Sequence, residues 1–257
     1  ISPRDWSSDV CSSDLIEDVA QKQDSISTAV VWAEALGLDP VLAQNDPHEV
    51  QAKLTVLRQE LDLAAKLMAE TPFSKDLYEP YLSRVRSTIS VGNISASWNN
   101  YKHYLQVDTR LALKYCAEIL PAEPAISMEE LQAVLDSAHR LRQEIEQSEL
   151  APAVREFLLS QLKIIEKGIQ DYPIRGGSAI KDAFKQGFSE FGSHCDVVKT
   201  DQDEKKTSRV VKVWSALKTA GKEIVEADRI ASAYVGLIDK GQDATKALLA
   251  LFDSGSN

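Results

Sequence analysis

The residues that could perform metal or acid–base chemistry are few and scattered along the chain. The four histidines are His48, His103, His139 and His194. No two of them stand four residues apart, which is the spacing that lets two imidazoles on one helix share a metal ion. The three cysteines form no paired-cysteine motif either. The sequence therefore predicts no metal site and no cofactor.

A cysteine–histidine catalytic pair would have to be brought together by folding. Cys116 lies on the apolar side of an expected helix, where a small buried thiol is the simpler interpretation. Cys195 follows His194 directly, and adjacent side chains point in different directions, so these two share no ligand geometry. We predict no catalytic residues. An unfamiliar hydrolase or nuclease using Cys195, His194 or His103 is kept as an alternative.

One short loop is a candidate anion site: Arg175, Gly176, Gly177 and Ser178. Free amides at the start of a helix, with an arginine beside them, can hold an anion. The loop lacks the glycine spacing and the lysine of a P-loop. A joint between two helices, with Ser178 as the cap of the second, explains the same residues more simply.

A mixture of basic and aromatic residues raises the question of nucleic acid, since aromatic rings can stack bases beside a positive groove. Arg84, Arg86, Lys102 and Arg110 flank Trp98, Tyr101 and Tyr104. The whole chain carries 29 basic and 39 acidic residues, a net charge of −10, which opposes binding to a polyanion. We expect the aromatic residues to fill the core, and nucleic acid is not an expected partner.

The elements that must position these residues are helices. Apolar residues recur at three- and four-residue steps along most of the chain, and no useful segment alternates with a period of two. The sequence predicts an all-α fold, a multi-helix bundle of antiparallel amphipathic helices with a C-terminal helical hairpin. Helices are expected over 16–36, 46–70, 74–90, 94–105, 108–120, 127–145, 152–171 and 178–188.

Helix-starting signals support several of these segments. Ser127 and Glu130 fit a capping box, and Asp46 can cap a helix that has Pro47 in its first turn. Pro80 predicts a late start or a kink in the 74–90 helix. Asp108 is expected to cap the following helix. Three apolar residues, Leu77, Leu111 and Tyr115, are expected on the inner faces of their helices.

The first residues resemble an artefact. Residues 9–15, DVCSSDL, are similar to the translation of a common sequencing-library adapter, GAC GTG TGC TCT TCC GAT CT. We expect 1–15 to be non-native or disordered, with the native N-terminus possible further upstream. Beyond it, the sequence predicts a helical body at 16–195, a polar linker at 196–208 and the C-terminal helical hairpin at 209–253.

The C-terminal segment 210–252 is rich in small residues, which let helices approach closely. Its candidate interaction residues are Trp214, Leu217, Ala220, Gly221, Ala227, Ala231 and Tyr234. Packing against the body or against a second copy explains this pattern. A membrane-acting effector that releases 210–252 is an alternative, although acids such as Glu223 and Asp239 oppose anionic lipid.

Composition completes the functional prediction. The chain is 44% hydrophobic and 26% charged, as globular proteins are. It has neither a signal-peptide pattern nor a disulfide framework, so a cytoplasmic location is expected. We predict a non-enzymatic helical interaction or adaptor protein, whose partner is another protein or a second copy of the chain through its C-terminal helices.

Overall fold

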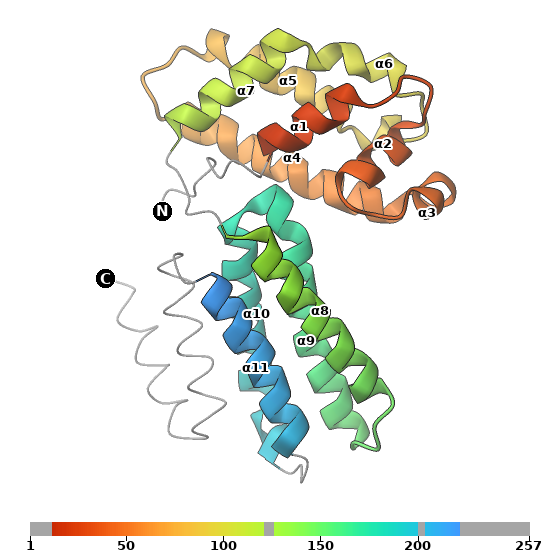
Figure 1. Cartoon of the computed structure of the whole chain (residues 1–257). Helices are drawn as coiled ribbons and strands as arrows, with labels where there is room; N and C mark the ends of the chain where they lie inside the picture. The colour runs from red at the N-terminus through yellow and green to blue at the C-terminus, as the bar shows by residue number, and fades with distance from the viewer. Residues whose placement is uncertain (1–11, 121–125, 200–203, 222–257) are drawn as a thin grey trace. The chain divides into compact units, whose positions relative to one another are not determined.

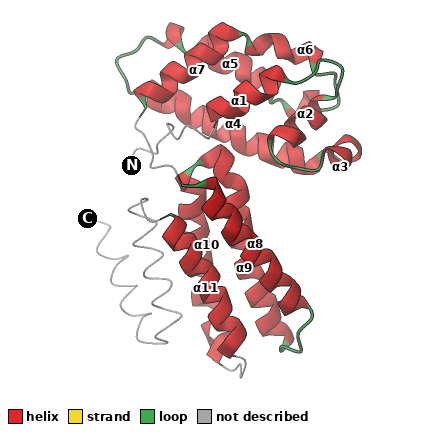
Figure 2. Ribbon diagram, viewed as in Figure 1, coloured by secondary structure: helices red, strands yellow, loops and turns green. Residues whose placement is uncertain are grey.

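The computed structural model describes residues 12–120, 126–199 and 204–221, with side chains described except at 12–14, 191–199 and 204–208. Every regular element of these residues is a helix, so the all-α prediction is confirmed (Figures 1 and 2). An isolated antiparallel bridge between Ser27 and Ser97 is the one β-type pairing in the described residues. Within this part of the chain, no helix is both long and apolar enough to cross a membrane.

The chain divides into two compact units that are discontinuous in sequence. Unit 1 contains the described residues up to 120 together with Asp171–Gly176, and unit 2 contains the described residues from Ile126 to Gln170 and from Gly177 onward. The sequence analysis did not predict this division. Its limits for a body, a linker and a C-terminal hairpin stay a prediction.

Unit 1 is built from short helices around one long helix. Its elements are α1 (Ser12–Gln21), α2 (Thr28–Ala35), α3 (Pro40–Asn45), α4 (His48–Met68), η1 (Lys75–Leu77), α5 (Glu79–Thr88), η2 (Val91–Asn93), α6 (Asn99–Lys102), η3 (His103–Leu105) and α7 (Val107–Ile119). The predicted 46–70 helix is confirmed as α4, whose apolar stripe is buried. The late start predicted from Pro80 is also found, because α5 begins at Glu79 with that proline in its first turn.

The core of unit 1 holds two tryptophans in contact. The rings of Trp32 and Trp98 meet edge to face, with centroids 6.1 Å apart. The Trp32 indole nitrogen Nε1 donates to the carbonyl oxygen of Thr88 at 3.3 Å, so its polar end is satisfied inside the core. Around this pair pack apolar residues from α1, α4, α5 and α7.

Two predictions for unit 1 need correction, and the prediction of a non-native or disordered segment at 1–15 stays a prediction. The expected 16–36 helix is two helices, α1 and α2, separated by residues 22–27. Helix α1 begins at Ser12, inside the segment expected to be non-native or disordered, and Leu15 is buried in the core. Asp108 lies in the first turn of α7 but does not cap it, since Gln106 holds the cap position and the Asp108 carboxylate pairs with Arg84.

Unit 2 consists of long helices that lie side by side in Figure 1: α8 (Met128–Glu146), most of α9 (Pro152–Arg175), α10 (Gly177–Lys199) and α11 (Glu204–Ala220). The predicted cap of α8 is confirmed, because the Ser127 hydroxyl accepts from the Glu130 amide at 3.4 Å. Helix α11 packs against α8. Glycines allow the closest approaches: a Cβ on Gly187 would lie 2.6 Å from the ring of Trp214.

The ends of α9 and α10 differ from the prediction. Helix α9 does not stop at 171–173 but continues through Pro173 to Arg175. Proline removes one backbone hydrogen bond, while buried Tyr172 and Ile174 hold the helical turn in place. Gly176 then ends α9 with a φ of 55°.

Helix α10 begins at Gly177 and runs to Lys199, so Ser178 lies inside a long helix and does not cap a short one. Residues 196–199 and 204–208 of the expected polar linker lie in α10 and α11. The second part of the expected C-terminal hairpin, residues 222–253, lies outside the described residues.

Candidate functional site

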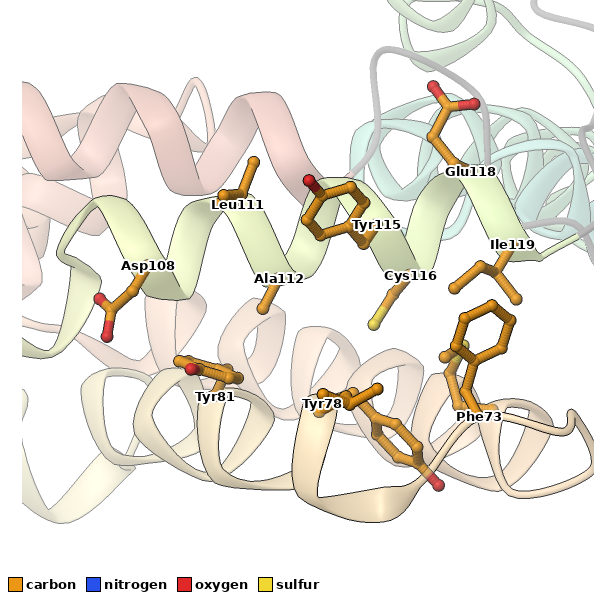
Figure 3. A pocket seen from close by; sticks show the side chains of 12 residues that line it. Phe73, Tyr78, Tyr81, Asp108, Leu111, Ala112, Tyr115, Cys116, Glu118 and Ile119 are labelled. Carbon is orange, nitrogen blue, oxygen red and sulfur yellow. The ribbon is translucent and has the colours of Figure 1, made fainter.

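The candidate site is an apolar groove in unit 1 with a volume of about 500 Å³, which we call the α5–α7 groove. One wall is α7. The other wall is the segment 73–81, which includes η1 and the start of α5. Met68 of α4, Tyr78, Ala112 and Cys116 form its buried floor. In Figure 3, Ala112, Cys116 and Ile119 point from α7 toward Tyr78, Tyr81 and Phe73.

The rim of the groove is apolar and open to solvent. Phe73 is 45% exposed, Leu77 61%, Leu111 47% and Tyr115 60%. These four belong to nine large hydrophobic residues that are exposed in the described part of the chain, so exposed apolar surface is concentrated here. The prediction that Leu77, Leu111 and Tyr115 face inward is therefore wrong. Each continues an apolar stripe beyond the edge of the core.

Cys116 is a neutral thiol in this site. It is 2% exposed, and burial raises its pKa to about 11. At neutral pH the thiolate, which is the nucleophilic form, is therefore scarce. The prediction of a small buried hydrophobe at this position is confirmed. Burial also raises the pKa of the neighbouring Tyr78, whose hydroxyl makes no hydrogen bond with any described residue.

The charged residues that line the groove are two carboxylates. Asp108 accepts a hydrogen bond from Arg84 at 2.6 Å and one from the Thr109 amide at 2.9 Å. The hydrogen bond from Arg84 lowers the pKa of Asp108. Glu118 is exposed and makes no ion pair with a described residue. Its carboxylate points away from the floor in Figure 3, so Glu118 is a charge on the rim.

No histidine is among the residues that line the groove with Cys116. His48 lies beside Asp46, His103 stacks on Tyr104, and His139 stands 3.9 Å from Glu166. Among the described residues, no group of three histidine, cysteine or acidic side chains is arranged to hold a metal ion. The side chains of His194 and Cys195 lie outside the described residues, so the hydrolase alternative that uses them stays a prediction.

The basic residues that flank Trp98, Tyr101 and Tyr104 in the sequence are all paired with acids. Arg84 binds Asp108, Arg86 binds Asp62 and Glu79, Lys102 binds Asp24, and Arg110 binds Glu17. Trp98 is buried in the core. These cations are therefore not a free positive surface, and this tryptophan is not available to stack a base.

The candidate anion loop is also engaged within the protein. Arg175 Nε lies 3.3 Å from the carboxylate of Glu60, a buried acid of α4. Ser178 is buried inside α10. Gly176 ends α9 and Gly177 begins α10. The four residues form the joint between two helices, with the arginine side chain held by an acid.

The candidate interaction residues of the C-terminal segment divide into two groups. Trp214, Leu217 and Gly221 are buried, and Ala220 is half-buried. Trp214 packs on Phe184 of α10 with ring centroids 5.0 Å apart. Ala227, Ala231 and Tyr234 lie outside the described residues.

A second, smaller cavity of about 330 Å³ lies between α8 and α11 in unit 2. Its charged lining is Arg140, Glu144, Arg209 and Lys212. Both carboxylate oxygens of Glu144 accept hydrogen bonds from the Arg209 guanidinium, which makes a bidentate ion pair on the surface. This pair ties α11 to α8 and explains why charges gather there.

The α5–α7 groove could not be predicted from the sequence of either wall alone. Its two walls are some 30 residues apart in the chain and meet only in the folded protein. The available signal was the excess of apolar residues on α7, where Leu111 and Tyr115 widen the stripe beyond one face. Comparisons with protein-family models, with curated proteins and with solved structures found no match for this chain.

Proposed function

We propose that this chain is a non-enzymatic helical interaction protein and that unit 1 binds an apolar partner in the α5–α7 groove. The observation that carries the proposal is the exposed rim of Phe73, Leu77, Leu111 and Tyr115 above a buried apolar floor. Large exposed apolar patches on globular proteins mark interaction sites or binding grooves.

The size of the apolar surface sets what the partner must do. Full burial of a large apolar side chain contributes about 1.5–3 kcal/mol. The four rim residues are already half covered, so burying the rest contributes roughly 4 kcal/mol. Association itself costs at least about 4 kcal/mol. Contact with the rim alone would therefore bind weakly, and a stable partner has to reach the floor between the two walls.

The direct test uses a neutral apolar dye, Nile red, with the full chain. Its fluorescence is expected to rise on binding in the groove. Leu111→Asp places a charge on one wall and is expected to reduce the bound signal several-fold. The matched control is Leu42→Asp on α3, which changes a leucine outside the groove that is 65% exposed, compared with 47% for Leu111.

The result that would overturn the proposal is equal dye binding by the native chain and Leu111→Asp, or an equal loss in both variants. Circular dichroism of each variant shows whether its helices are retained. A second wall variant, Leu77→Asp, repeats the test in case Leu111→Asp fails to fold. The membrane and hydrolase alternatives gain no supporting observation from the described residues.

A further inference from the structure

We propose that the partner held in the α5–α7 groove is an amphipathic α-helix of about three turns that carries a lysine or arginine where it passes Glu118. This inference rests on the proposed function and adds the chemistry of the partner. Its premises are the helix ridge on one wall, the openness of the groove and the sign of its charged groups.

One wall of the groove, α7, carries a helix ridge. On α7, Val107, Leu111 and Tyr115 follow one another at four-residue steps and are all exposed. The opposite wall is not one helix: Phe73 lies before η1, Leu77 lies in η1 and Tyr81 lies in the first turn of α5. Residues four apart on a helix form a ridge, and the groove beside such a ridge accepts the ridge of another helix.

The length of the groove fixes the length of the partner. The α7 residues that line the groove run from Asp108 to Ile119, over which the helix advances by about 16 Å at 1.5 Å per residue. A partner helix lying along it would have about 12 residues. Apolar side chains on its first, fourth or fifth, and eighth residues would meet the floor.

The exposure of the rim favours a helix over a small molecule. Binding sites for small molecules usually cover most of the ligand surface. Here Leu77 and Tyr115 are each about 60% exposed, so the groove covers one side of its occupant only. An amphipathic helix suits that geometry, because its other face is polar and stays in water.

The charges at the groove indicate which charge the partner helix should carry. Asp108 is already held by Arg84, but Glu118 has no ion pair with a described residue. The nearest cation along α7, Lys114, lies 2.9 Å from Glu17 and is engaged there. A cation on the partner would therefore find Glu118 available at the C-terminal end of α7. Rim charges of this kind steer association and select between partners.

The test measures binding of fluorescein-labelled helical peptides of about 14 residues to the full chain by fluorescence anisotropy. The first peptide has a leucine ridge and a lysine pair at one end. The second has glutamates in place of those lysines, and the third is a scrambled form of the first. The first peptide is expected to bind most tightly, and its advantage over the second should shrink as salt is raised.

Charge reversal on the protein provides the decisive comparison. Glu118→Lys is expected to weaken the lysine peptide about fivefold and to strengthen the glutamate peptide by a similar factor, as for one exposed ion pair. The matched control is Glu156→Lys on α9, an exposed acid without an ion pair to a described residue, which changes the net charge equally.

Each outcome decides something. If Nile red binding depends on the groove but no peptide binds, the helical partner is wrong and the proposed function stands. If Leu111→Asp changes neither the binding of the dye nor the binding of the peptides, both proposals are wrong. Equal binding of the lysine and glutamate peptides, or of the scrambled peptide, overturns the assignment. A dimer of the full chain that Leu111→Asp abolishes would assign the groove to a second copy and overturn it as well.

Discussion

At the scale of single residues, Glu17 is the acid that ties α1 to α7. It pairs with Lys114 at 2.9 Å and also with Arg110. Hydrogen bonds from Lys114 and then Arg110 lower its pKa from an ordinary value near 4.5, although partial burial acts the other way. A carboxylate whose pKa is lowered by folding stabilises the native state above the unfolded pKa. That stabilisation is lost as the pH falls through the folded pKa.

Glu17→Gln is therefore expected to lower the free energy of unfolding at pH 7 by about 1 kcal/mol. The difference from the native chain should shrink as the pH falls below about 4.5, where Glu17 of the unfolded chain is protonated, and disappear below the lowered pKa of folded Glu17. Urea unfolding at pH 7 and near pH 3 measures it. Glu156→Gln, at an exposed position without an ion pair to a described residue, is the control. A pH-independent difference would contradict the ion-pair explanation.

Residues whose environment is local could be predicted, and those at the edge of a packed face could not. Ser127 was predicted as a cap because a cap needs only the amide three residues ahead. Cys116 was predicted as buried from the side of the helix it occupies. Leu111 and Tyr115 were placed on the inner face by the same periodicity, yet the core ends before it reaches them. Where a core ends depends on the neighbouring helices.

At the scale of elements, close approach between helices rests on glycine. Gly187 of α10 lies against the buried ring of Trp214 from α11, with a prospective Cβ 2.6 Å from Cζ2 and 2.8 Å from Cη2. Real side-chain atoms do not approach so closely. Trp214 is fully buried, so the ring has little room to withdraw.

Gly187→Ala is expected to destabilise the chain by about 1–2 kcal/mol. Overpacking costs about 1–3 kcal/mol, and the better helix propensity of alanine returns up to about 1 kcal/mol. In a Trp214→Leu background, Gly187→Ala should reduce the free energy of unfolding by less, because the smaller leucine side chain leaves space for the added methyl group. Thermal unfolding of the four chains measures this coupling. An equal cost in both backgrounds would mean that the ring is not the obstacle.

Periodicity predicted the long helices and failed at their connections. The stripe of α4 and the late start of α5 follow from residues within each segment. The break between α1 and α2 does not follow from local residues, because backbone groups there form hydrogen bonds with a distant segment. The Thr28 amide, for example, donates to the Ala96 carbonyl at 2.8 Å. The passage of α9 through Pro173 likewise depends on packing that no local signal reveals.

At the scale of the whole molecule, a six-residue segment from the middle of the chain completes unit 1. Asp171–Gly176 belongs to unit 1 although its flanking helices belong to unit 2. Asp171 pairs with Lys53 at 2.6 Å, and both side chains are nearly buried. The two partners are 118 residues apart in sequence, so neither composition nor periodicity could predict their contact.

Asp171→Asn is expected to destabilise unit 1 by up to about 3–5 kcal/mol, since a nearly buried ion pair with Lys53 is broken. Hydrogen exchange followed by mass spectrometry should show faster exchange in α4, while α8 and α11 keep their rates. Asp18→Asn, which removes a surface pair with Lys22 at 3.4 Å, is the control and should change little. Uniformly faster exchange in both units would contradict a local role for this pair.

The late position of that six-residue segment has a consequence for synthesis. The ion pair of Lys53 with Asp171 cannot form until Asp171, 118 residues further along the chain, has been synthesised and has left the ribosome. Maturation of the first half of the protein is thus timed by the translation of the second.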